Sequence, residues 1–239
     1  MASLMLPVAV WAAPKKSTPA PSKPKPEQAK PATPTPAPAV PVSPDGTAPS
    51  AENRQQAQAI FDVAMEAFQR GDAKTAREGL QKVLTMSPNN VPALLNLAIL
   101  EQRLKSFDLA ERYLRQVLSA DQKSASAWLL LGIGAYEQGK MEAASAHLAE
   151  AVLYAPKNAQ AHQYLGVVLG RRGWYSAGEE ELRRAVELDP NQAESNYNLA
   201  VLYMERVPPS TELARRHYQR ALELGATPDP ELAKKLEGQ

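Results

Sequence analysis

Residues 125–158, ASAWLLLGIGAYEQGKMEAASAHLAEAVLYAPKN, are the clearest copy of a pattern that the chain repeats every 34 residues. A proline, a glycine, and a leucine followed by a small residue all return at this spacing, which is a typical length for a repeated pair of helices. The spacing is kept at Leu97, Leu131, Leu165 and Leu199, at Pro88, Pro156 and Pro190 with Gln122 in the remaining place, and at Gly71, Gly139 and Gly173 with Lys105 in the remaining place.

Each copy has the pattern of two amphipathic helices joined by a short turn. In residues 57–90, apolar or small side chains recur every three or four residues up to Ala67, and the pattern resumes at Ala76. Gly71 interrupts it, since glycine readily adopts the left-handed conformation that ends a helix. The copy therefore predicts a helix, a turn and a second helix.

The copies follow one another along most of the chain. Four of them, at 57–90, 91–124, 125–158 and 159–192, are contiguous, and a fifth at 193–226 carries two extra residues in its turn, between Val207 and Ser210. Asp229 followed by Pro230 is typical of a helix start, so we expect a short capping helix over residues 229–238. Such a helix would cover the last apolar face of the stack.

The third copy carries the residues of a known family. Trp128, Leu131, Gly132, Ala144 and Pro156 match the Trp, Leu, Gly, Ala and Pro of the tetratricopeptide repeat, and the chain resembles exported bacterial members of that family. The resemblance implies an all-α tetratricopeptide-repeat solenoid. It would hold five helix-turn-helix pairs over residues 51–224, end in the capping helix, and follow a disordered Pro-rich segment. We expect Trp128 to lie between helices.

The residues before the repeats have a different composition. Residues 14–50 hold 12 of the 21 prolines and neither leucine nor aromatic residues, so we expect a disordered linker. Its five lysines could contact cell wall or membrane, a question that the sequence leaves open. Residues 1–13 resemble the end of a signal peptide without its basic region, which favours a periplasmic or secreted protein, with a cytoplasmic location as the alternative. They are too few to span a bilayer.

Charge and residue types exclude several function classes. Residues 51–239 carry a net charge of −2, which argues against nucleic-acid binding. The chain has no cysteine, and its histidines (His147, His162 and His217) do not stand at metal-ligand spacing. Gly132 and Gly134 are interpreted as sites of close helix packing. We therefore expect no enzymatic activity, no cofactor and no metal.

The charges on the second helices of the repeats predict surface ion pairs. Residues four apart on a helix lie side by side, so opposite charges at this spacing attract. The expected pairs are Glu179 with Arg183, Glu180 with Arg184, and Glu212 with Arg216.

The family resemblance implies where a partner would bind. In tetratricopeptide repeats the first helix of each pair lines a concave groove, and fixed positions on it meet the ligand. Those positions here are Phe61, Met65 and Phe68; Leu95, Asn96, Ile99 and Arg103; Leu129, Ile133, Tyr136 and Glu137; Gln163, Tyr164, Val167 and Arg171; and Tyr197, Asn198, Val201 and Met204. The lysines that clamp a C-terminal carboxylate in some family members are absent, with Phe61 and Leu95 among the residues in their place.

This groove indicates a protein-binding scaffold. Its apolar and aromatic residues suit an amphipathic helix or an extended peptide, and we expect tyrosines such as Tyr136 to serve as anchors. The identity of the partner and the oligomeric state stay open. The alternatives are a cytoplasmic co-chaperone or assembly adaptor, and a cell-wall or polysaccharide binder. The polysaccharide alternative is favoured if Trp174 and the tyrosines are exposed in a row.

Overall fold

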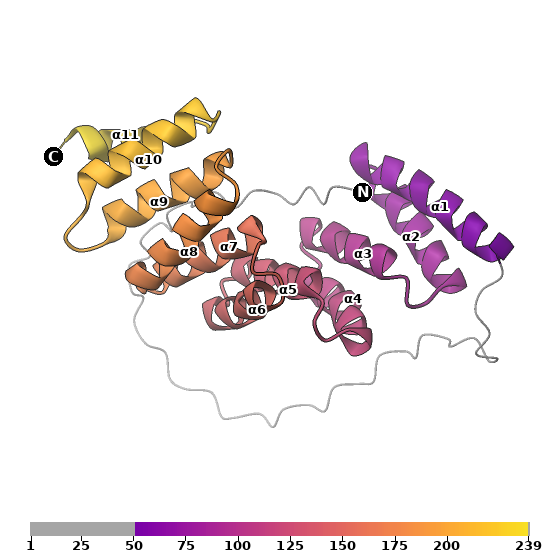
Figure 1. Cartoon of the computed structure of the whole chain (residues 1–239). Helices are drawn as coiled ribbons and strands as arrows, with labels where there is room; N and C mark the ends of the chain where they lie inside the picture. Colours follow the sequence, from indigo (N-terminus) through magenta and orange to yellow (C-terminus); the bar gives the residue numbers. More distant parts are fainter. Residues whose placement is uncertain (1–50, 239) are drawn as a thin grey trace, which may run out of the picture.

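The computed structural model describes residues 51–238. The predicted signal-peptide remnant at 1–13 and the predicted linker at 14–50 lie outside these residues. Within the described part the chain is all-α and forms no strand. The helices follow one another as an open, curved stack (Figure 1).

Within residues 51–238, ten helices form five antiparallel pairs and an eleventh short helix follows them, which confirms the predicted solenoid. Each helix packs most extensively against the other member of its own pair. The helices are α1 (Ala51–Gln69), α2 (Ala73–Met86), α3 (Val91–Arg103), α4 (Phe107–Ala120), α5 (Ala125–Glu137), α6 (Met141–Tyr154), α7 (Ala159–Arg171), α8 (Tyr175–Leu188), α9 (Ala193–Glu205), α10 (Thr211–Glu223) and α11 (Pro230–Glu237).

The turns within the pairs use the glycines that the repeat predicted. Gly71, Gly139 and Gly173 have φ angles of 79°, 74° and 81°, which residues with a β-carbon adopt at a cost. Lys105 occupies the same place in the second pair and takes a φ of 61°. The repeat architecture thus imposes the left-handed turn even where the sequence lacks glycine.

Glycine also permits close packing of helices, both within a pair and between neighbouring pairs. A β-carbon on Gly132 would lie 2.5 Å from Cγ of Leu148, and one on Gly166 would lie 2.9 Å from the carbonyl oxygen of Gly178. A β-carbon on Gly134 would lie 2.6 Å from Nε2 of Gln102. These distances agree with the interpretation of Gly132 and Gly134 as packing residues.

The core is a series of clusters that each join one pair to the next. Leu97 of the second pair packs with Leu80 and Val83 of the first, and Leu131 of the third pair packs with Leu114 of the second. Each pair therefore buries its apolar face only against its neighbours, as expected for a solenoid.

Trp128 lies between two of these clusters, as predicted. It packs at the edge of the clusters of both the second and the third pair. Its indole Nε1 donates a hydrogen bond to the carbonyl oxygen of Gln122 (2.8 Å), and its ring stacks on His147 with 5.5 Å between centroids. The side chain thus joins the second pair, the intervening turn and the third pair.

The last pair is closed by α11. Asp229 accepts hydrogen bonds from the backbone N–H groups of Glu231 (2.9 Å) and Leu232 (3.1 Å), which makes it the N-cap that the sequence predicted. Leu232 and Leu236 are buried against α9 and α10. The longer turn of the fifth pair, between Glu205 and Thr211, leaves this pairing intact.

The predicted surface ion pairs were wrong in their partners. Glu179 contacts Tyr203 (2.9 Å) and Arg206 (3.5 Å) of the next pair instead of Arg183. Arg184 pairs with Glu187 (3.0 Å) rather than with Glu180. Glu212 pairs with Arg215 in place of Arg216. The spacing of charges four apart on one helix does not show that a residue of the next pair, or a residue three positions away on the same helix, is the closer partner.

Candidate peptide-binding groove

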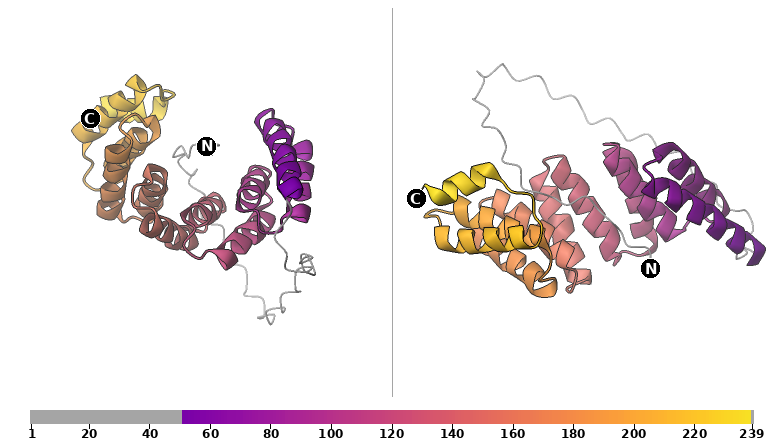
Figure 2. Two further views of the ribbon diagram at one scale, coloured as in Figure 1. Left: turned by 45° about the vertical axis from the view of Figure 1, so that its right-hand side comes forward. Right: turned by 90° about the horizontal axis from the view of Figure 1, so that it is seen from above.

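The odd-numbered helices lie on the inside of the curve. Helix α3 contacts α5, α5 contacts α7, and α7 contacts α9. In a curved stack, alternate helices come this close on the concave side. Figure 2 shows the curvature, with the first and the last pairs as the two arms. We call the side of the odd-numbered helices that faces into this curve the inner face.

The structure divides the predicted groove residues into two groups. Ten are buried among their neighbours and offer little surface to a ligand: Leu95, Ile99, Leu129, Ile133, Gln163, Tyr164, Val167, Tyr197, Asn198 and Val201. Nine keep accessible surface, and every odd-numbered helix contributes at least one of them: Phe61, Met65, Phe68, Asn96, Arg103, Tyr136, Glu137, Arg171 and Met204.

The accessible group includes two arginine–aromatic contacts, each joining one pair to the next. The guanidinium of Arg103 lies 4.6 Å from the ring centroid of Phe68, and that of Arg171 lies 5.2 Å from the centroid of Tyr136. Such contacts hold both side chains in place while part of each stays exposed. Burial raises the pKa of the Tyr136 hydroxyl, and the Arg171 charge opposes that shift.

Tyr164 and Tyr197 have other roles than the exposed anchors that the sequence suggested. Tyr164 is only 2% exposed and packs edge to face against Tyr136. The hydroxyl of Tyr197 donates to Oδ2 of Asp229 (2.6 Å), so this side chain holds the cap in place. Burial and this hydrogen bond both raise the pKa of Tyr197. Trp174 is exposed at the α7–α8 turn, but Tyr164 and Tyr197 are buried and so do not form an exposed row with it.

Among residues 51–238, two buried amides on α7 and α9 of the inner face have side-chain atoms without a hydrogen-bond partner. Both side-chain polar atoms of Asn198 are buried and unpaired, as is Nε2 of Gln163. An unsatisfied buried polar group costs about 1–3 kcal/mol. By contrast, the buried Gln102 amide donates to the carbonyl oxygen of Leu130 (2.7 Å). The C-terminal part of the inner face therefore carries polar groups that local packing leaves unsatisfied.

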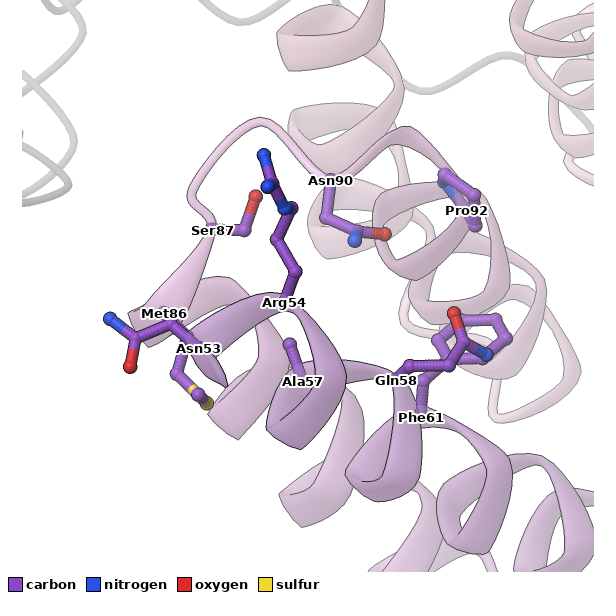
Figure 3. A pocket seen from close by; sticks show the side chains of 9 residues that line it. All are labelled: Asn53, Arg54, Ala57, Gln58, Phe61, Met86, Ser87, Asn90 and Pro92. Atoms are coloured by element: carbon purple, nitrogen blue, oxygen red, sulfur yellow. The ribbon is translucent and has the colours of Figure 1, made fainter. Parts of the chain in front are cut away.

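The N-terminal part of the inner face holds a hollow of about 340 Å³. Its lining comes from α1, the α2–α3 turn and the start of α3 (Figure 3). Phe61 and Pro92 supply apolar surface beside the polar groups of Arg54 and Gln58. Asn53 and Arg54 were not among the predicted groove residues, because they precede the first 34-residue copy. Helix α1 begins six residues before that copy, and this extra length is the sequence feature from which the two residues could have been predicted.

Among residues 51–238, no cluster of His, Cys, Asp or Glu could hold a metal ion, and no helix is long and apolar enough to cross a membrane. His147 and His162 each contact a side chain of the protein. His147 stacks on Trp128, and Nδ1 of His162 lies 2.6 Å from Oε2 of Glu181.

Comparison with known families matches nearly all of the repeated region. One family model of the tetratricopeptide repeat matches residues 67–133 and 104–166, and a second model of this repeat matches residues 165–230. The chain belongs to the tetratricopeptide repeat family. No curated protein matches the sequence of this tetratricopeptide repeat protein.

Several solved structures share the fold of this tetratricopeptide repeat protein. PilF of Pseudomonas aeruginosa is 24% identical with a TM-score of 0.68, over 78% of this chain and 86% of that one. MamA from Desulfovibrio magneticus RS-1 is 21% identical with a TM-score of 0.61, over 71% and 94%. YrrB, described as having an unusual peptide-binding site, is 19% identical with a TM-score of 0.58, over 79% and 95%. At these identities the likeness shows the fold alone.

Proposed function

We propose that this chain is a non-catalytic scaffold that binds a peptide or an amphipathic helix of a partner protein along its inner face. The observation that carries the proposal is the strip of nine accessible groove residues, to which all five odd-numbered helices contribute. Peptide-binding grooves combine apolar anchors with a few polar groups that fix orientation. Aromatic, thioether, amide and guanidinium groups are all present in this strip.

The main contact should lie in the N-terminal half of the groove. Phe61, Met65 and Phe68 keep accessible surface there, beside the hollow of Figure 3. The places equivalent to Phe61 and Met65 in the third pair are filled by the buried side chains of Leu129 and Ile133. An apolar side chain of the ligand would enter the hollow next to Phe61, while Arg103 and Glu137 would contact its polar groups.

We further propose that the protein acts in the bacterial envelope. The support is the sequence of residues 1–13, which resembles the end of a signal peptide. Mass spectrometry of the mature chain tests this: an N-terminus at Ala13 or Pro14 is expected, whereas a mature chain that keeps residues 1–13 would favour a cytoplasmic adaptor.

Affinity capture from envelope extract tests the groove. The chain with Phe61→Ser and Phe68→Ser should lose its partners, because these variants remove both accessible aromatic side chains of α1 from the groove. The matched control is Leu153→Ser with Trp174→Ser, which removes exposed apolar surface outside the groove. Partners that bind both double variants equally would contradict the proposal, provided that circular dichroism shows equal helix content.

A further inference from the structure

The first pair exposes a surface that every later pair buries. Val63 stands 34 residues before Leu97 and so occupies the same repeat position as Leu131, Leu165 and Leu199. Each of these leucines is buried in a cluster with the preceding pair. Val63 is 57% exposed, because no helix of residues 51–238 packs on that side.

This exposed surface, the N-terminal face, is formed by both helices of the first pair. It comprises Gln56, Ala59, Ile60 and Val63 of α1 with Thr75, Glu78 and Lys82 of α2, around a shallow hollow of about 440 Å³. Ala59 follows the same rule as Val63: its equivalents Ala93, Ala127 and Ala161 are fully buried. The N-terminal face is therefore built as a packing surface.

A second copy cannot cover this face by continuing the stack head to tail. The surface that the fifth pair would offer includes Ala200, Tyr218 and Ala221, and α11 already covers it with Leu232 and Leu236. Asp229, Tyr197 and Tyr218 hold α11 in place. The open end of one copy can therefore meet only the open end of another.

The charges along α1 favour such a pairing. An exposed row with alternating spacings of four and three residues runs along one face of α1 and ends at the residue that follows the helix: Glu52, Gln56, Ala59, Val63, Glu66 and Arg70. In an antiparallel pair of α1 helices centred between Ala59 and Val63, Glu52 of each copy lies opposite Arg70 of the other. Ala59 lies opposite Val63, a small residue against a larger one. A parallel pair would oppose Glu52 to Glu52 and Arg70 to Arg70.

We propose that the N-terminal face is a homodimer interface in which two copies pack their α1 helices antiparallel about a two-fold axis. The row is self-complementary, as a two-fold interface requires. Helix α1 has 19 residues where the other odd-numbered helices have 13, so it extends the contact beyond the 34-residue unit. The apolar part of the row is short, so we expect a weak dimer with a dissociation constant in the micromolar range. The dimer carries two grooves, which strengthens binding to a partner with two sites.

Sedimentation velocity of the full chain over a concentration series tests the interface. The wild-type chain is expected to shift from monomer to dimer as concentration rises, and Val63→Glu should raise the dissociation constant at least tenfold. Leu153→Glu, on the exposed side of α6, is the control and should leave it unchanged. A chain that stays monomeric into the high micromolar range overturns the proposal, even if another ligand binds this face. A dimer that Val63→Glu does not weaken overturns it as well.

A charge exchange tests the antiparallel register. Glu52→Arg and Arg70→Glu should each weaken the dimer several-fold, since each places like charges opposite one another. The double variant should recover most of the wild-type affinity. A double variant weaker than either single one would overturn the antiparallel arrangement. Neither experiment involves groove residues, so its failure would leave the proposed peptide binding standing.

Discussion

The two ends of the solenoid are built from the same repeat but finish differently. At the C-terminal end, the apolar face of α9 and α10 is covered by α11, whose first turn is held by Asp229. At the N-terminal end, Val63 and its neighbours on α1 are exposed. The comparison teaches that a repeat position does not determine burial by itself; the neighbour on each side does.

The largest effect is expected where one repeat position is compared between the end and the interior. Leu97→Ala should destabilise the protein by about 3–5 kcal/mol, because the side chain is fully buried against Leu80 and Val83. Val63→Ala, at the same position of the first pair, should cost less than about 0.5 kcal/mol. Urea unfolding of dilute protein, where any dimer is dissociated, measures both. Equal losses would contradict the account of the open end.

A second comparison concerns the N-caps at the two ends. Asp229→Ala should cost about 2 kcal/mol, since it removes the cap of α11 and leaves the Tyr197 hydroxyl without its acceptor. Asp72→Ala removes the cap of α2, where the carboxylate accepts from the N–H of Thr75 in an exposed turn, and should cost less. Thermal melts of both variants give the difference. A larger loss for Asp72→Ala would show that α11 does not seal its end.

The turn at Lys105 offers a smaller and opposite effect. Lys105→Gly should stabilise the protein by about 0.5 kcal/mol, because glycine relieves the strain of a φ of 61°. The gain is reduced by the greater freedom of glycine in the unfolded chain and by loss of the exposed ion pair with Glu137. Gly139→Lys, the reverse change in the next pair, should destabilise. Chemical unfolding of both checks the sign; a loss with Lys105→Gly would contradict it.

The smallest effect is a pH dependence of stability, which comes from histidines of the third and fifth pairs. Burial lowers the pKa of His147 and of His217, which stack on Trp128 and Tyr203. These histidines bind protons more readily in the unfolded chain than in the folded one. The free energy of unfolding should therefore fall as the pH drops below about 6.5, the pKa of histidine in the unfolded chain. Melting temperatures between pH 7.5 and 5.5, roughly the range where histidine alone titrates, measure it. The variant with His147→Gln and His217→Gln should show a flatter profile; an unchanged slope would assign the effect elsewhere.

The sequence predicted the helices, their pairing and the cap, because the 34-residue spacing reports contacts between neighbouring pairs. Leu97 and Leu131 are buried by the pair before them, and this requirement recurs in the sequence. The accessible surface of the groove could not be predicted in the same way. Tyr197 donates its hydroxyl to Asp229, 32 residues later, and the buried Tyr164 packs edge to face against Tyr136. Such outcomes depend on which side chains meet across pairs, and a position within the repeat does not specify them.

The central claim is that the inner face, and its N-terminal half above all, binds a partner protein. Photo-crosslinking in intact cells tests it most directly, with a photoreactive phenylalanine analogue placed at Phe61, Phe68 or Met204 in the groove and at Leu153 or Trp174 outside it. The account predicts one shared partner adduct from the groove positions, strongest at Phe61 and Phe68, that is absent from the two outer positions. Adducts of equal strength from Leu153 and Trp174, or none from Phe61 and Phe68, would contradict it.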